Sequence, residues 1–266
     1  GRRMQTISGI HYNWSLPGLD NARYFGLIRN FRRQSFLLLT LFGASPAVCT
    51  SFVAGRDHGL EPLAGNTLYL PHATSLRMGN LGYRSEAQAS LAVSYNSLDS
   101  YGASLQQALT RSWPAYEAIG IRNLGGEYNQ LATSLLQIEN EFYGTIRPKR
   151  VIHPGERPLH ALRERGVEYV EVRCMDLDPF LPVGIDAATQ ERIGALPDRL
   201  NAKRIARPLH FGAFVEVVPG IEGLPFLLRL FLHALFNQVA CHRMHDQFHA
   251  GCGRCGLAGV VVGCGA

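Results

Sequence analysis

The sequence has 266 residues, of which 46% are hydrophobic and 18% are charged, so it is too apolar for a disordered polymer and can form a large core. The net charge of +5 comes without a block of basic residues, which argues against a nucleic-acid partner. The most apolar stretch, 224–236, contains Arg229 and His233 and is shorter than the roughly 20 residues that a membrane span needs. No signal-peptide pattern stands at the start, and six cysteines do not form a disulfide framework in a chain this long, so we expect a cytoplasmic protein.

Periodicity, caps and turn residues predict alternating strands and helices along the first 175 residues. The strands are predicted where apolar and polar residues alternate, which is typical of a strand with one buried face. In chain order we expect a strand at 5–16, a helix from Asn21 to about Leu41, a glycine-rich loop at 54–66, a helix from Ser97 to about Ile119, a strand at 135–143, a loop and short helix at 154–166, and a strand at 167–175.

The character of the sequence changes after Asp186. Residues 189–266 hold five of the ten histidines and four of the six cysteines, and their periodicity is weak. We therefore predict one domain at 1–188 and an unassigned tail at 189–266. The tail has the residue types of a zinc site but lacks a second ligand pair at the usual spacing. The candidate ligands are Cys241, His242, His245, His249, Cys252 and Cys255.

Two charged residues on the last predicted strand could form part of a catalytic site. Glu171 and Arg173 are two residues apart, so their side chains point to the same face, about 6.5–7 Å apart. A carboxylate suits Mg²⁺ and a guanidinium suits phosphate oxygens, so the pair could hold a metal–phosphate from two sides. The alternative is a cross-strand salt bridge on a solvated face, which the pattern by itself favours. The basic run at 147–150 is typical of a solvated segment.

Other polar residues are open to two interpretations. His11 could bind a metal through a neutral imidazole, or it could be a hydrogen-bonded core histidine. Arg77 and Tyr83 flank a short turn and could bind a small carboxylate, although each is ordinary by itself. Glu139 and Glu141 share a face and could be metal ligands, a pair with a raised pKa, or exposed side chains.

Several segments in a fixed order carry a resemblance to a known family. They are Met4–Pro17 (MQTISGIHYNWSLP), Leu41–Ala47 (LFGASPA), Thr74–Arg77 with Leu81–Tyr83 (TSLR, LGY), Leu136–Tyr143 (LQIENEFY), Ile146–Arg150 (IRPKR) and Glu168–Arg173 (EYVEVR). Together they resemble the signature segments of the proteobacterial-type glutamate–cysteine ligases. The resemblance covers about residues 4–186.

The resemblance implies a fold, a reaction and a set of site residues. The fold is α+β, with an antiparallel sheet, helices packed on one face and an incomplete glutamine-synthetase-like catalytic architecture. The reaction uses ATP and Mg²⁺ to join the γ-carboxylate of glutamate to the amine of cysteine through an acyl phosphate, which is the first step of glutathione biosynthesis. By similarity, the site residues are a catalytic Arg173, the metal ligands His11 and Glu171, and the cysteine-pocket residues Arg77, Tyr83 and Tyr143.

Three departures from the family pattern qualify this expectation. Further metal carboxylates of the family lie in an N-terminal portion that this sequence lacks, the connection from Pro17 to Tyr24 is short, and the resemblance stops near Asp186. We therefore expect a fragment with little or no activity alone, and we interpret the tail as an aberrant reading frame. The alternatives are another ATP-dependent carboxylate–amine ligase, or an inactive fragment with a C-terminal Cys/His metal-binding module. The expected partners are L-glutamate, L-cysteine and ATP, and neither nucleic acid nor a membrane.

Overall fold

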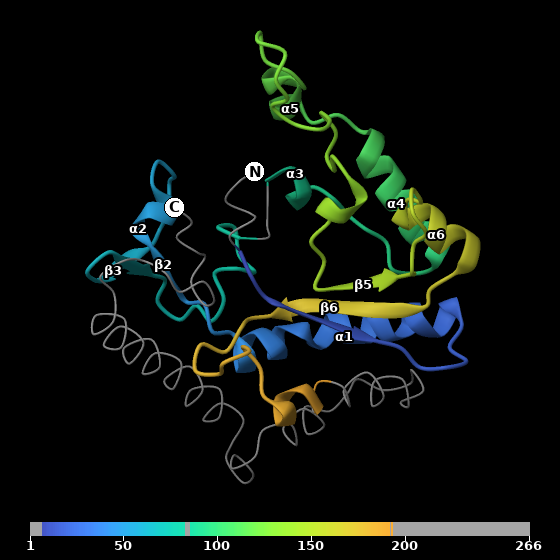
Figure 1. Cartoon of the computed structure of the whole chain (residues 1–266), viewed down its shortest axis with the longest axis horizontal. Helices are drawn as coiled ribbons and strands as arrows, with labels where there is room; N and C mark the ends of the chain where they lie inside the picture. The colour runs from blue at the N-terminus through green and yellow to red at the C-terminus, as the bar shows by residue number, and fades with distance from the viewer. Residues whose placement is uncertain (1–6, 83–85, 192, 194–266) are drawn as a thin grey trace. The chain divides into compact units, whose positions relative to one another are not determined.

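The computed structural model describes residues 7–82, 86–191 and 193, and these residues have an α+β architecture (Figure 1). The strands are β1 (Ile10–Trp14), β2 (Ala47–Cys49), β3 (Glu61–Ala64), β4 (Thr67–Tyr69), β5 (Ile146–Lys149) and β6 (Tyr169–Met175). The helices are α1 (Asn21–Phe42), α2 (Thr50–Val53), α3 (Glu86–Ala89), α4 (Leu98–Thr110), α5 (Pro114–Ile119) and α6 (Pro158–Arg165), with a 3-10 turn at Glu139–Glu141. None of the described helices combines the length and apolar character that crossing a bilayer requires.

The described strands form two three-stranded sheets, in the orders β1-β6-β5 and β2-β4-β3. β5 pairs antiparallel with β6, and both β2 and β3 pair antiparallel with β4. The predicted α+β class with antiparallel strands is therefore confirmed.

The chain divides into two compact units. The first contains the described parts of Gly1–His11, Gln34–Tyr83 and Arg173–Ala266, and the second contains those of Tyr12–Arg33 and Arg84–Val172. Three elements, β1, α1 and β6, pass from one unit into the other. The predicted tail lies outside the described residues apart from 189–191 and 193, and its Cys/His cluster lies entirely outside them.

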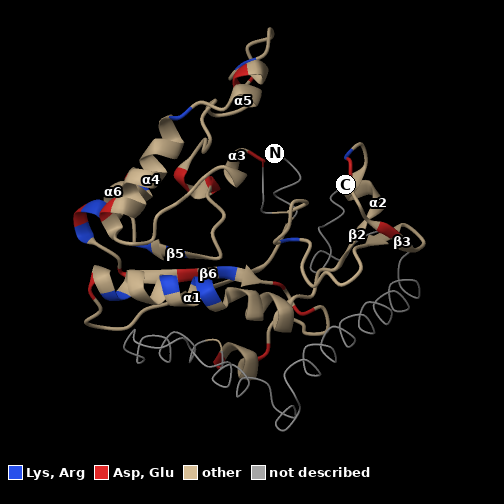
Figure 2. Ribbon diagram, turned by 180° about the vertical axis from the view of Figure 1, so that it is seen from behind, with Lys and Arg blue, Asp and Glu red and all other residues tan. Residues whose placement is uncertain are grey.

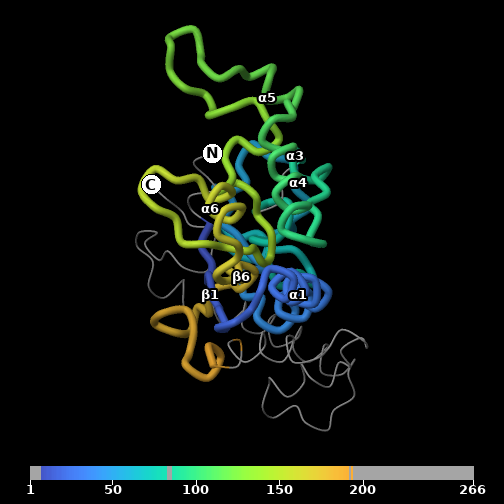
Figure 3. The backbone as a smooth tube through the Cα atoms, turned by 90° about the vertical axis from the view of Figure 1, so that its right-hand side faces the viewer, coloured from blue at the N-terminus to red at the C-terminus, as the bar shows by residue number. Residues whose placement is uncertain are grey.

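The core of the second unit forms around α4, α6 and the first part of α1. The rings of Phe25 and Tyr101 lie 5.8 Å apart and join α1 to α4, and both residues are buried. Helices α4 and α6 lie side by side (Figure 3), and a Cβ on Gly102 would meet Arg163 and Leu159 of α6 at 3.1–3.4 Å. The absence of a side chain at Gly102 therefore permits the close approach of the two helices.

The helix predicted from Ser97 begins as expected but ends earlier. Ser97 and Ser100 form a reciprocal capping box, in which each side chain accepts the other residue's backbone N–H. The helix ends at Thr110 because Arg111 is extended and Pro114 begins a new helix, α5. Proline lacks the N–H that a continuous helix would need and is favoured in a first helical turn. The prediction of one helix to Ile119 was therefore wrong.

Two further predictions on secondary structure were also wrong. The strand expected at 135–143 is absent, and the structure has a 3-10 turn at Glu139–Glu141 instead. The Glu141 carboxylate accepts the backbone N–H of Gln137 at 2.6 Å, so a side chain closes the turn locally and replaces strand pairing. The loop expected at 54–66 contains β3, which pairs with β4.

The remaining elements agree with their predictions. On β1, Ile10, Tyr12 and Trp14 are more buried than His11 and Asn13, as the alternation predicts. Helix α1 runs over Asn21–Phe42, and Gly166 ends α6 with a positive φ of 72°. β6 lies in the middle of its sheet and is buried on both faces, so its polar row does not face solvent.

Candidate active site

The two charged residues of β6 are both buried, although charged side chains are rarely buried unless they are paired. Glu171 is 8% exposed and Arg173 is 7% exposed. Acidic and basic residues follow each other along this strand (Figure 2). Burying a charge without a partner costs free energy, so the contacts of Glu171 and Arg173 determine what these side chains can bind.

Glu171 is held from the neighbouring strand by Arg147. The antiparallel register places these residues directly opposite each other, and Arg147 donates from Nε at 3.2 Å and from Nη2 at 2.8 Å to Glu171 Oε2. Lys149 Nζ lies 3.8 Å from the same oxygen. The cross-strand salt bridge that the pattern favoured is therefore present, but it is buried and not solvated. The expectation of a solvated run at 147–150 was wrong for Arg147, which is 7% exposed.

The same guanidinium also holds the segment that precedes Tyr143. Arg147 Nη1 donates to the backbone carbonyls of Asn140 at 3.3 Å and Phe142 at 3.1 Å. Tyr143 follows directly and is half-buried. Sequence reasoning missed Arg147 because the strand register, which a single sequence does not give, determines its partner.

A cavity of about 360 Å³ lies in the second unit beside this pair. Its lining includes Arg147 and Lys149 from β5, Tyr169 from β6 and apolar residues of α4 and α6. Burial lowers the pKa of Lys149, while the neighbouring Glu171 acts in the opposite direction. The cavity therefore combines apolar walls with a half-buried ammonium group.

In the first unit, Arg77 is almost completely buried, at 1% exposure, and its charge is paired. Arg77 Nε lies 2.6 Å from Asp176 Oδ1, and Nη1 donates to the backbone carbonyl of Arg173 at 3.1 Å. Arg77 therefore contacts the backbone of the residue predicted to be catalytic.

Asp176 accepts further hydrogen bonds from three groups. The Ser75 hydroxyl donates to Oδ1 at 3.1 Å, and the Ser45 hydroxyl and the Ala44 N–H donate to Oδ2 at 2.7 and 3.0 Å. Asp176 is 6% exposed, so these bonds and the Arg77 pair offset the cost of burying its charge. Sequence reasoning missed Asp176. The sequence did offer one signal, because an acidic residue stands directly after the apolar end of a predicted strand.

Glycines from two of the signature segments fit around Arg77. A Cβ on Gly9 would lie 2.5 Å from Arg77 Cζ, and a Cβ on Gly82 would overlap the Arg77 backbone. Gly9 belongs to the first signature segment and Gly82 to the segment that follows Arg77. The first signature segment therefore meets the Arg77 guanidinium, while Gly82 packs against the Arg77 backbone.

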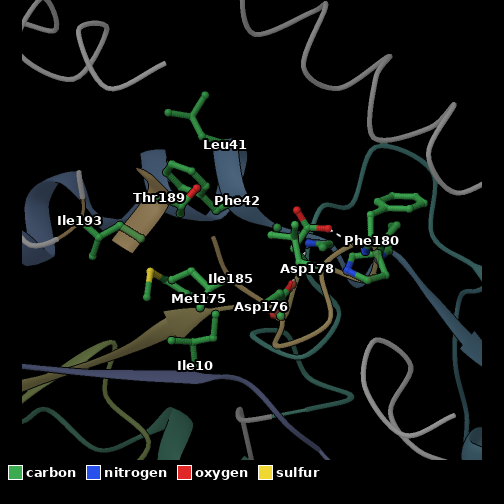
Figure 4. A pocket seen from close by; sticks show the side chains of 16 residues that line it. Ile10, Leu41, Phe42, Met175, Asp176, Asp178, Phe180, Ile185, Thr189 and Ile193 are labelled. Atoms are coloured by element: carbon green, nitrogen blue, oxygen red, sulfur yellow. Dashed lines mark hydrogen bonds between the residues drawn. The ribbon is translucent and has the colours of Figure 1, made fainter. Parts of the chain in front are cut away.

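A second cavity, of about 250 Å³, lies in the first unit (Figure 4). Its lining is mainly apolar and includes Ile10, Met175 and Phe180, with Asp176 and Asp178 as acidic members. Both oxygens of the Asp176 carboxylate already accept hydrogen bonds from the protein.

The predicted site residues are distributed over both units. His11, Arg77 and Arg173 belong to the first, and Glu171 and Tyr143 belong to the second. Tyr83 lies outside the described residues. His11 is exposed on β1, which is next to β6 in the strand order.

Within the described residues, the only group of three or more potential metal ligands is Glu156, His160 and Glu164, near and on α6. Arg165 forms two short hydrogen bonds with Glu156, which lower the pKa of that carboxyl group to about 2. This group is mostly exposed and its carboxylates pair with arginine, so it resembles a surface ion-pair cluster.

Comparisons with known proteins agree with this fold. The sequence model of the glutamate-cysteine ligase family matches residues 1–196. The chain is 53% identical over 213 residues to glutamate–cysteine ligase of Janthinobacterium sp. (strain Marseille), covering 73% of this chain and 40% of the relative. It is 55% identical over 205 residues to the enzyme of Saccharophagus degradans, covering 70% of this chain and 39% of the relative.

A solved structure shares the fold. Glutamate–cysteine ligase from Francisella tularensis, crystallised in complex with AMP, superposes with a TM-score of 0.70 and 39% sequence identity. The match covers 80% of this chain and 45% of that structure. The chain therefore has a glutamine-synthetase-like α+β fold, as predicted. It belongs to the glutamate–cysteine ligase family, and it spans about two fifths of the length of the curated relatives it matches.

Proposed function

We propose that this chain provides part of the active site of a ligase that joins the γ-carboxylate of glutamate to the amine of cysteine. The observation that carries the proposal is the buried pair Glu171 and Arg173 on β6, within a segment that matches the family. A carboxylate is a poor electrophile, so ATP first phosphorylates it. The cysteine amine then attacks the acyl phosphate and expels phosphate. The AMP bound to the Francisella relative supports a nucleotide site of this kind.

The charges around Glu171 fit a metal–nucleotide better than a free metal ion. Arg147 and Lys149 contribute two positive charges beside one carboxylate, which disfavours a bare divalent cation. Mg²⁺ in nucleotide sites is commonly held by one or two carboxylates together with phosphate oxygens and water, and the phosphates bring net negative charge. Glu171 and His11 would be the protein ligands, and bound Mg²⁺ would neutralise charge on the phosphoryl oxygens.

Arg173 and the cysteine-pocket residues have separate roles in this proposal. The fork of donors on the Arg173 guanidinium suits a carboxylate or a phosphoryl group, and the Arg77 contact fixes the Arg173 backbone. Arg77, Tyr83 and Tyr143 would line the cysteine pocket. Since Arg77 is 1% exposed, a direct contact with cysteine requires the packing beside it to open.

A chimera tests the proposal in a whole enzyme. Residues 1–196 of this chain would replace the matched segment of the Saccharophagus degradans relative, and γ-glutamylcysteine and phosphate would be measured. We expect formation of both products to depend on ATP and Mg²⁺. Glu171→Gln should lower kcat at least about 100-fold, in the range by which metal ligands and their partners act. The matched control is Glu168→Gln, an exposed carboxylate three residues earlier, which should change kcat less than about twofold.

Two results would contradict the proposed function. One is a folded chimera that consumes ATP but joins glutamate to a different amine in preference to cysteine. The other is a chimera in which Glu171→Gln and Glu168→Gln have equal and small effects, because the buried carboxylate would then have no role in the reaction.

A further inference from the structure

All three nitrogens of the Arg147 guanidinium are engaged, and they connect two separate parts of the second unit. Nε and Nη2 donate to Glu171 Oε2, at 3.2 and 2.8 Å. Nη1 donates to the carbonyls of Asn140 and Phe142, at 3.3 and 3.1 Å. The side chain is only 8% exposed, so solvent does not compete strongly for these bonds.

We propose that Arg147 is a positioning residue that fixes the metal-binding carboxylate and the acceptor-side segment relative to each other. The inference rests on the function proposed above, in which Glu171 is a metal ligand and Tyr143 lines the cysteine pocket. The guanidinium is planar and rigid, so a bond to Glu171 on one edge determines where the other edge meets the Asn140 and Phe142 carbonyls.

The alternative is that Arg147 serves stability alone. A buried salt bridge contributes little net stability compared with apolar residues of similar volume, because desolvation offsets the attraction between the charges. Groups that orient a metal ligand, by contrast, commonly change metal affinity 10- to 100-fold when they are altered. Metal-dependent binding therefore distinguishes a positioning role from a purely structural one.

The test uses the chimera described above, in which the relative supplies the rest of the enzyme's length, and measures ATP binding by equilibrium dialysis, with and without Mn²⁺ as a substitute for Mg²⁺. The variant is Arg147→Lys, which keeps the charge but cannot contact Glu171 and both carbonyls at once. We expect it to reduce the Mn²⁺-dependent gain in ATP affinity about 10- to 100-fold and to leave metal-free ATP binding unchanged. The matched control is Arg150→Lys, since Arg150 contacts Glu168 and the Arg165 carbonyl in the same segment.

Two further measurements examine each end of the arrangement. In a Glu171→Gln background, Arg147→Lys should cause no additional loss of metal-dependent affinity. Arg147 acts on the metal through the Glu171 carboxylate, so its effect should disappear once that carboxylate is gone. Hydrogen exchange of the amides at 139–145 should accelerate in Arg147→Lys and not in Arg150→Lys, because the carbonyl contacts of that segment are lost.

The outcomes separate this inference from the proposed function. If the unaltered chimera shows the Mn²⁺-dependent gain and both lysine variants retain it, Arg147 is not a positioning residue and the inference alone fails. If the unaltered chimera shows no such gain, the metal role of Glu171 fails and the inference fails with it. If neither Arg147→Lys nor Arg147→Gln folds by circular dichroism, the role of Arg147 is structural and the inference is overturned.

Discussion

Asp176 Oδ1 lies 2.6 Å from Arg77 Nε, and this contact joins two buried residues that are 99 positions apart in the sequence. The carboxylate also accepts hydrogen bonds from Ser45, Ser75 and the Ala44 backbone. The end of β6, the turn after α1 and the Ser75–Arg77 segment thus meet at a single carboxylate in the first unit.

Replacement of Asp176 should destabilise the first unit strongly. Asp176→Ala leaves the Arg77 charge buried without its partner, and breaking a buried pair in this way costs about 3–5 kcal/mol of unfolding free energy. Urea denaturation followed by circular dichroism measures the change. The control is Asp178→Asn, since the Asp178 carboxylate accepts only the nearby Phe180 N–H among its described hydrogen bonds. Equal losses in the two variants would contradict a special role for the Arg77–Asp176 pair.

A side chain at Gly9 should destabilise the fold, because Gly9 lies against the Arg77 guanidinium, which Asp176 and the Arg173 carbonyl hold in place. A Cβ there would be 2.5 Å from Arg77 Cζ and 2.6 Å from Nη1, so Gly9→Ala should cost about 1–3 kcal/mol, as overpacking of a buried site usually does. Gly59→Ala provides the comparison, because a Cβ at Gly59 meets no atom within 4 Å. The prediction would be wrong if both variants unfolded at the same urea concentration as the wild-type chain.

Cys174 should be unreactive in the folded chain. Burial raises the pKa of its thiol to about 12, with the nearby Arg77 charge acting in the opposite direction. Because the thiolate is the reactive form, iodoacetamide at pH 8 should label Cys174 only after unfolding, whereas the half-buried Cys49 should react earlier. Mass spectrometry of the digested chain identifies the labelled position. Labelling of Cys174 in the native chain as fast as Cys49 would contradict the buried position on β6.

The raised pKa of Cys174 also has a consequence for stability at high pH. A thiol whose pKa is higher in the folded than in the unfolded state stabilises the fold fully below the unfolded value, here 9.0, and this contribution is lost as the pH rises toward about 12. Cys174→Ala should therefore reduce the loss of stability between pH 9 and 11, measured by urea denaturation at each pH. If the stability of Cys174→Ala had the same pH dependence as that of the wild-type chain, the raised pKa of Cys174 would be contradicted.

The strands and helices with a clear periodicity could be predicted from the sequence, whereas the site contacts could not. The alternation at β1, the apolar spacing of α1 and the glycine that ends α6 are local signals, and each element appears at its predicted place. The cap expected at Asn21 was wrong, because Asp20 accepts the Arg23 N–H and Asn21 accepts the Val167 N–H. The alternation at 135–143 was misleading because the Glu141 side chain closes a turn there. The partners of Glu171 and Arg77 depend on strand register and on residues 24 and 99 positions away, which periodicity does not specify.

The 266-residue chain should form little or no γ-glutamylcysteine by itself. It spans about two fifths of the length of its curated relatives, and the predicted metal ligands within it are one carboxylate and one imidazole. Because metal sites for phosphoryl transfer rely on a complete set of positioned ligands, we expect product below about 1% of the amount made by the chimera under the same conditions. Chromatography of the reaction with ATP, Mg²⁺, glutamate and cysteine measures the product. Formation of γ-glutamylcysteine that requires both ATP and Mg²⁺, and that Glu171→Gln abolishes, would show that the residues present here are sufficient for catalysis.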